Sequence, residues 1–273
     1  MKEIDFLSNE IYRRYGSVTR ARGPFLYTAK NQRLVDMFQE NGRAILGWGG
    51  GTAFTMLKNA LSRGATGSYH TDFSHRLKKA VSTLLESERK IYVFSDKKNA
   101  MEAALSLCEN GTSVYKPWSD ASVDWTTVSA VILEPPLPWT AGIYILAVED
   151  SLDMEIRLAK IQDTFHTVYL PSPIEAAATR AIYNLIQALK EREEKDWFIY
   201  DKALIPYWER RGPYLYIRQE AISREDFPGF LCHCLDCGIV INPLYSGASI
   251  VPFGADRGVF TKLIKNPFKP SDN

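Results

Sequence analysis

The sequence has no long hydrophobic run and no excess of charge of either sign. Its 273 residues include 33 Lys and Arg against 32 Asp and Glu, which gives a formal net charge of +1. Apolar stretches such as 143–148 have the length of a strand, whereas a membrane helix needs roughly 20 apolar residues. A dedicated nucleic-acid binder usually has a basic excess. We therefore expect no membrane span and no nucleic acid among its partners.

Cysteine and histidine are also scarce, with four residues of each type. Four cysteines are too few for a disulfide scaffold in a chain of this length. The first residues, MKEID, lack the basic and then apolar pattern of a signal peptide. These absences predict a soluble, reduced, cytoplasmic protein.

Three of the cysteines lie close together, in the segment Cys232-His233-Cys234-x-x-Cys237. A zinc site needs about four ligands, usually as two pairs separated in the chain. On a helix, Cys234 and Cys237 share a face, as do His233 and Cys237, but Cys232 points elsewhere. We interpret these residues as thiols packed on a helix and assign no metal ligand. A small metal-binding module is the weaker alternative.

Strands and helices alternate through the middle of the sequence. Such alternation predicts an α/β domain with a mainly parallel sheet, over residues 48–173. Residues 1–47 and 174–273 are expected to form a smaller α+β domain. The expected strands are 90–94, 114–115, 128–133, 143–148, 214–218 and 239–242, with a hairpin turning at 29–32, and the expected helices lie within 1–22, 53–62, 71–85, 97–108, 174–194 and 227–237.

The junction between the strand at 90–94 and the helix at 97–108 carries a polar segment, Ser95-Asp96-Lys97-Lys98-Asn99. A strand-to-helix junction directs free backbone N–H groups at an anion. Lys97 and Lys98 would favour a phosphate there, whereas the carboxylate of Asp96 would oppose it. The alternative interpretation is a plain capped helix with solvated charges.

Several colinear segments together resemble one family, the class III aminotransferases. This pyridoxal-phosphate (PLP) family includes glutamate-1-semialdehyde aminomutase. The resemblance spans nearly the whole chain and is carried by 22–37 (RGPFLYTAKNQRLVDM), 93–104 (VFSDKKNAMEAA), 131–135 (VILEP), 169–178 (YLPSPIEAAA) and 230–243 (FLCHCLDCGIVINP).

The resemblance implies a reduced form of the PLP-dependent transferase fold type I. Its large domain would be three-layered, α/β/α, beside the small α+β domain, and the chain would form a homodimer or pair with a full-length relative. The cofactor-binding candidates are the remains of the family's phosphate cup and of its Glu-Pro strand, namely Ser95, Lys97, Lys98, Asn99 and Glu134.

The departures from the family concern its chemistry. Asp96-Lys97-Lys98 replaces the phosphate-binding Ser-Gly-Thr. The strand ending at Glu134 runs almost directly into the glycine-containing segment 140–144, so the Schiff-base lysine and the aspartate that protonates the cofactor ring have no counterpart. Between 117 and 172 the only lysine is Lys160, in a helical pattern. Without that lysine, the cofactor has neither an anchor nor a proton carrier.

We therefore expect a pseudoenzyme with a binding or scaffolding role and assign no catalytic residue. No covalent cofactor is expected, although PLP is the family cofactor and could bind weakly without a covalent bond. The alternative is an active PLP-dependent aminotransferase or aminomutase in which Lys97 or Lys98 has taken over. Trp118, Trp125 and Trp139 are expected to fill the shortened region.

Overall fold

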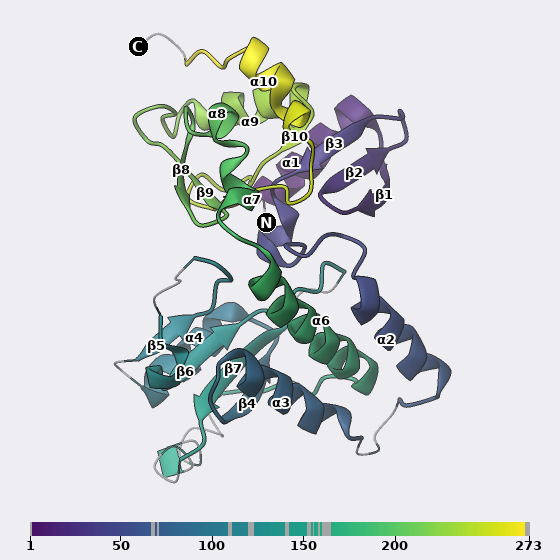
Figure 1. Cartoon of the computed structure of the whole chain (residues 1–273), viewed down its shortest axis with the longest axis vertical. Helices are drawn as coiled ribbons and strands as arrows, with labels where there is room; N and C mark the ends of the chain where they lie inside the picture. Colours follow the sequence, from purple (N-terminus) through teal and green to yellow (C-terminus); the bar gives the residue numbers. More distant parts are fainter. Residues whose placement is uncertain are drawn as a thin grey trace. The chain divides into compact units, whose positions relative to one another are not determined.

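A computed structural model describes residues 2–66, 69, 71–108, 111–119, 123–139, 142–151, 154, 156–157, 159 and 165–270. The chain divides into two compact units. We call Met1–Gly49 with Arg192–Asn273 the terminal unit, and Gly50–Glu191 the central unit. Figure 1 labels the elements of both.

The central unit contains a four-stranded sheet in the order β4-β7-β6-β5. β5 pairs with β6 in parallel, whereas β7 is antiparallel to both β4 and β6. The elements of this unit are α2 (Gly51–Ser62), α3 (Phe73–Leu84), β4 (Arg89–Phe94), α4 (Lys97–Leu107), β5 (Thr112–Val114), η2 (Trp125–Thr127), β6 (Ala130–Leu133), β7 (Tyr144–Glu149) and α6 (Ser172–Glu191).

The sheet was expected to be mainly parallel. Most of its strands do run in the same direction, but most neighbouring strands pair antiparallel. β4, β5 and β6 run in one direction and β7 runs in the other. Because β7 lies between β4 and β6, two of the three ladders are antiparallel. The sequence shows where each strand lies but contains no local signal for its neighbour.

Both faces of this sheet are buried. Every residue of β6 is at most 2% exposed, so alternate side chains point into two different layers. On one face α4 packs through positions spaced i, i+3, i+4 and i+7, the stripe expected of an amphipathic helix. These residues are Ala100, Ala103, Ala104 and Leu107. α3 contacts β4 and packs against α6, which completes the predicted α/β/α layering.

The long helix α6 belongs to the central unit. It packs along α2 and α3, as Figure 1 shows. The boundary predicted at 173/174 instead places this helix in the small domain. The structure differs there because the buried side of α6, including Ala177, Ala181 and Leu185, contacts these central-unit helices.

The terminal unit contains two small sheets, in the orders β1-β2-β3-β10 and β11-β9-β8. β10 joins β3 in parallel although about 200 residues separate them in the chain, with Val35 opposite Ile239. The elements are α1 (Lys2–Tyr15), β1 (Val18–Arg22), β2 (Phe25–Thr28), β3 (Arg33–Asp36), η1 (Gln39–Gly42), α7 (Lys195–Phe198), α8 (Asp201–Leu204), β8 (Trp208–Arg211), β9 (Tyr214–Ile217), α9 (Phe227–Asp236), β10 (Ile239–Val240), β11 (Ser249–Ile250), η3 (Arg257–Phe260) and α10 (Thr261–Lys265).

The N-terminal segment corrects one prediction and confirms another. The expected helix over 1–22 ends at Tyr15, because Gly16 adopts a left-handed φ of +74° and the chain then enters β1. The expected hairpin is present as β2 and β3, with Thr28 bonded to Gln32 across the predicted turn.

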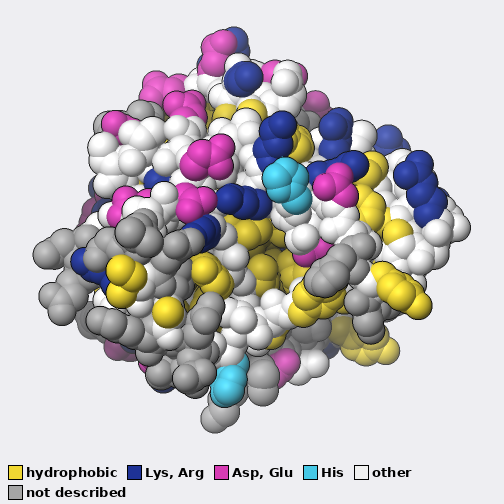
Figure 2. All heavy atoms as spheres, turned by 90° about the horizontal axis from the view of Figure 1, so that it is seen from below, with side chains coloured by type: hydrophobic (Ala, Val, Ile, Leu, Met, Phe, Trp, Pro, Cys, Tyr) yellow, Lys and Arg dark blue, Asp and Glu magenta, His cyan; other side chains and the backbone are white. Residues whose placement is uncertain are grey.

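Within the described residues, no helix is both long enough and apolar enough to cross a membrane. The surface charge is mixed, in keeping with the net charge of +1. On the face seen in Figure 2, Lys and Arg side chains lie among Asp and Glu side chains.

Candidate functional site

The junction between β4 and α4 brings four of the five predicted site residues together. Ser95, Lys97, Lys98 and Asn99 lie in one exposed stretch at the N-terminus of α4. Asp96 is the N-cap residue, with extended backbone angles, and its carboxylate accepts a hydrogen bond from the backbone N–H of Asn99 at 3.0 Å. The helix terminus is therefore occupied by a carboxylate of its own chain, as the capping prediction stated.

The two lysines of this stretch extend into solvent. The Lys98 side chain is 81% exposed, and its ammonium lies 3.5 Å from the carboxylate of Glu102, one turn further along the helix. Lys97 is also exposed. An ion pair between such exposed groups contributes little to stability because water screens it. Neither lysine is desolvated, which is the usual way in which a protein turns an amine into a nucleophile.

Glu134 lies at the same end of the sheet as Ser95, two strands away. It follows β6, whereas Ser95 follows β4, and β7 separates these two strands. In the register of the sheet, Leu133 faces Ile145 and Phe94 faces Tyr144. Two strand spacings place the backbones roughly 10 Å apart. Glu134 is half-buried.

Gly142 is a residue of this site that the sequence analysis did not single out. It has a left-handed φ of +67°, and a Cβ atom added there would lie 2.8 Å from the backbone carbonyl oxygen of Ser95. The segment leading into β7 therefore lies directly against the start of the α4 junction. A lone glycine before an apolar strand is the only sequence signal for this close approach.

The described residues do not fit the phosphate of PLP at this terminus. A phosphate needs unoccupied N–H groups and benefits from a glycine that lets the backbone approach it. Here Asp96 places a negative charge in that position and accepts from one of those N–H groups.

The described lysines of the central unit also do not have the buried surroundings expected of a lysine that holds a cofactor covalently. Among its described residues none is buried: Lys58, Lys78, Lys79, Lys90, Lys97, Lys98, Lys116 and Lys190 are exposed or half-buried. Lys78 and Lys90 both pair with Asp150, at 3.1 and 3.3 Å. Lys160 lies outside the described residues.

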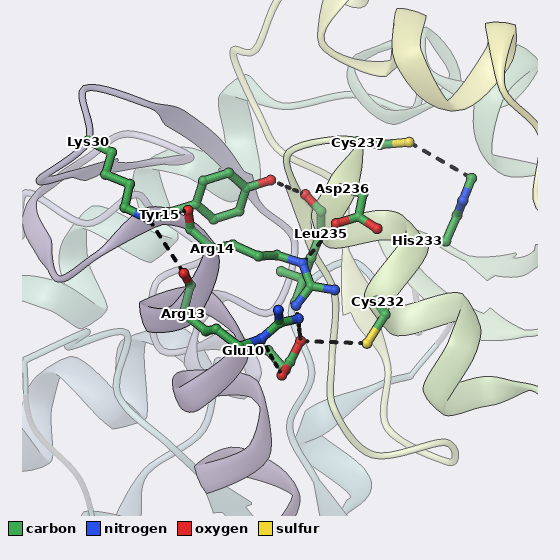
Figure 3. Close-up of polar contacts among 10 residues, drawn as sticks. All are labelled: Glu10, Arg13, Arg14, Tyr15, Lys30, Cys232, His233, Leu235, Asp236 and Cys237. Carbon is green, nitrogen blue, oxygen red and sulfur yellow. Dashed lines mark hydrogen bonds and ion pairs between the residues drawn. The ribbon is translucent and has the colours of Figure 1, made fainter.

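The cysteines of α9 have separate surroundings. Figure 3 shows the thiol of Cys232 directed towards Glu10 of α1, at 3.8 Å, and that of Cys237 towards His233, also at 3.8 Å. Cys234 is fully buried, and burial raises its pKa. The described residues contain no group of three or more His, Cys, Asp or Glu that could hold a metal ion. The predicted packing of thiols on a helix is what the structure has.

The polar contacts around these cysteines join α9 to α1. Arg14 of α1 pairs with Glu10 on its own helix and, at 2.8 Å, with Asp236 of α9. The hydroxyl of Tyr15 donates to the backbone carbonyl of Leu235. This arrangement holds the two helices together.

The three tryptophans expected to fill the shortened region have two different locations. Trp118 and Trp125 line a cavity of about 330 Å³ beside the edge strand β5, together with Tyr115. Trp139 contacts the ring of Phe54 in α2, with ring centroids 6.2 Å apart. The ring of Tyr115, which follows β5, lies 4.9 Å from that of Trp125 between centroids.

Comparisons with known proteins were made by sequence and by structure, and the structural matches give the fold. No protein-family model matches the chain. Two relatives, both described only as uncharacterized proteins, come from Treponema pallidum and Borreliella burgdorferi. The Treponema pallidum protein is 26% identical, and the match covers 89% of this chain and 91% of that protein. The Borreliella burgdorferi protein is also 26% identical, and the match covers 92% of each chain.

Solved structures of PLP-dependent enzymes match almost the full length. Ornithine aminotransferase from Plasmodium yoelii matches with a TM-score of 0.64 at 12% identity, covering 96% of this chain and 97% of the other. Acetylornithine aminotransferase from Elizabethkingia anophelis has the same coverages and a TM-score of 0.65 at 11% identity. A serine palmitoyltransferase variant from S. paucimobilis, solved with a bound PLP–myriocin aldimine, gives 0.65 at 9% identity, covering 97% of each chain. The chain therefore has the fold of PLP-dependent aminotransferases.

Proposed function

We propose that this protein is a class III aminotransferase-like pseudoenzyme, similar to glutamate-1-semialdehyde aminomutase, which does not carry out PLP–lysine chemistry. The observation that carries the proposal is the N-terminus of α4, where the carboxylate of Asp96 accepts from the backbone of Asn99 at 3.0 Å. A fold persists after its site is lost, because fold and function are specified by different residues. The role that remains is binding or scaffolding, as a homodimer or with a full-length relative.

The lysines of the central unit support the same proposal. PLP enzymes hold their cofactor as an imine on a lysine whose amine is kept partly unprotonated. The described lysines of this unit are exposed or half-buried. None of them has the buried surroundings that keep an amine unprotonated for such chemistry.

The test is to mix the purified protein with PLP, record the visible absorption spectrum, reduce with borohydride and measure the protein mass. We expect neither a shifted absorption band nor a mass gain on one lysine. A specific mass gain that disappears in the Lys97→Ala/Lys98→Ala double variant would instead establish a relocated lysine and reject the proposal.

A gain-of-binding variant examines the role of Asp96 directly. Asp96→Gly removes the carboxylate and frees the backbone N–H groups, so non-covalent PLP should quench tryptophan fluorescence more strongly than in the wild type. Asp72→Gly is the matched control, because Asp72 is the N-cap residue of α3 but accepts no capping hydrogen bond. Equal quenching in the two variants would show that Asp96 does not exclude the phosphate.

A further inference from the structure

A second open space lies within the terminal unit, between α1 and the β1-β2-β3-β10 sheet. It is a pocket of about 490 Å³, within the size range of small-molecule sites. Its walls are mainly apolar side chains from both elements. Examples are Leu7 and Ile11 of α1 and Leu26 and Val240 of the sheet.

The charged residues that line this pocket are all acidic. Asp36 and Glu40 contribute carboxylates, and the fifteen lining residues include neither lysine nor arginine. The carboxylate of Glu40 lies 2.6 Å from the guanidinium of Arg43, so its charge is balanced. Asp36 differs, because no lysine or arginine among the described residues forms an ion pair with it.

Asp36 is 1% exposed and is held by neutral donors alone. Its Oδ1 accepts the backbone N–H groups of Phe38 and Gln39, each at 2.9 Å, and its Oδ2 accepts the indole N–H of Trp48 at 2.6 Å. An ionised carboxylate has about four acceptor positions, so these three bonds leave one. Burial raises the pKa of Asp36 to about 6, which leaves it mostly ionised at pH 7.5.

We propose that this pocket binds an organic cation with an apolar chain, of the alkylammonium class. The chain would lie against the apolar walls, and the ammonium would face Asp36, whose negative charge has no positive partner. The rings of Tyr12 and Trp48 also line the pocket, and aromatic faces attract cations. An anionic ligand would meet the unpaired charge of Asp36 and no lysine or arginine among the residues that line the pocket. This inference concerns the terminal unit and does not depend on the proposed function.

The test compares three probes that share one chain and differ in charge: octylammonium, 1-octanol and octanoate. Each is titrated into the full chain at pH 7.5, below its aggregation concentration, by calorimetry and by the fluorescence of tryptophan. We expect octylammonium to bind at least about tenfold more tightly than 1-octanol, because only the cation meets an unpaired buried charge. We expect octanoate to bind least.

Two variants and one control assign the effect to this pocket. Asp36→Asn keeps the size of the side chain and removes its charge, so the preference for the cation over the alcohol should disappear. Ala21→Met adds volume to the pocket from β1 and should weaken the binding of both probes, so it tests the site even if Asp36→Asn fails to fold. Asp5→Asn removes an exposed acid from α1 outside the pocket and should leave both affinities unchanged.

The outcomes separate cleanly. Equal affinity for octylammonium and 1-octanol, a cation preference that survives in Asp36→Asn, or binding unaffected by Ala21→Met would each overturn the proposal. Absence of binding by all three probes would also overturn it. None of these results changes the absorption and mass experiment on PLP, which reports on lysines alone.

Discussion

Asp36 of the terminal unit and Asp96 of the central unit present the same carboxylate in opposite surroundings. Asp96 is exposed and caps α4 by accepting one backbone N–H. Asp36 is 1% exposed, accepts three neutral donors and lines an apolar pocket. Water screens the charge at the first position, whereas the charge at the second is felt strongly by any group that enters the pocket.

The two proposals together place a ligand site of this fold under α1 and not at the start of α4. At the start of α4, the carboxylate of Asp96 accepts from one of the N–H groups that a phosphate would need. Under α1, the fold leaves a space of about 490 Å³ with a buried acid on its wall. Three changes sharpen or break this contrast.

The largest expected effect is the pH dependence that burial gives to Asp36. Its folded-state pKa of about 6 lies above the ordinary value of 3.8. The stability that this group contributes is therefore complete below about pH 4 and is lost as the pH rises through 6. Between pH 4.5 and 7.5 the wild type should lose about 2 kcal/mol relative to Asp36→Asn, as measured by urea unfolding. Parallel pH profiles for the two proteins would mean that Asp36 is not buried as a carboxylate.

A smaller effect is expected from Gly142→Ala, which tests the close approach at the α4 junction. The new Cβ would lie 2.8 Å from the carbonyl oxygen of Ser95, on a backbone with φ of +67°. Gly64→Ala is the control, because Gly64 has a φ of +65° but no neighbouring atom within 4 Å of the added Cβ. Gly142→Ala should lower the free energy of unfolding by about 1–2 kcal/mol more than the control does. Equal losses would leave only backbone strain and remove the crowding argument.

The smallest effect is expected from Asp96→Ala. Loss of the capping bond to the backbone of Asn99 should lower the free energy of unfolding by about 1 kcal/mol. Asp72→Ala provides the comparison, since that N-cap residue of α3 accepts no capping bond. Its exposed ion pair with Arg76 contributes little. If Asp72→Ala cost as much stability as Asp96→Ala, the role of Asp96 as a cap would be refuted.

Much of the secondary structure could be predicted because its signals are local. The N-cap at Asp96 is followed by apolar residues at helical spacing, and α4 has the expected start and nearly the expected end. The apolar run that ends at Leu133 is β6. The predicted helix over 1–22 is longer than α1, because the residues after Gly16 show no apolar alternation that would indicate a strand. They form β1, which is mostly exposed and therefore needs few apolar residues.

The candidate site could be predicted only in part, for the same reason. Ser95, Lys97, Lys98 and Asn99 are neighbours in the chain and stay neighbours in the structure. Glu134 depends on strand order, and the insertion of β7 between β4 and β6 places it two strands away. The pocket under α1 had one weak signal, a carboxylate at Asp36 after the apolar pair Leu34-Val35.

The sequence by itself determined the longer helices, most strands and the cap of α4. These depend on side chains within a few residues of one another, so local chemistry decides them. Only the tertiary structure decided that β7 pairs between β4 and β6 and that Asp36 meets Trp48 at an apolar pocket. Strand order depends on contacts between residues that are distant in the chain. The surroundings of a carboxylate depend on the side chains that pack around it in the folded protein.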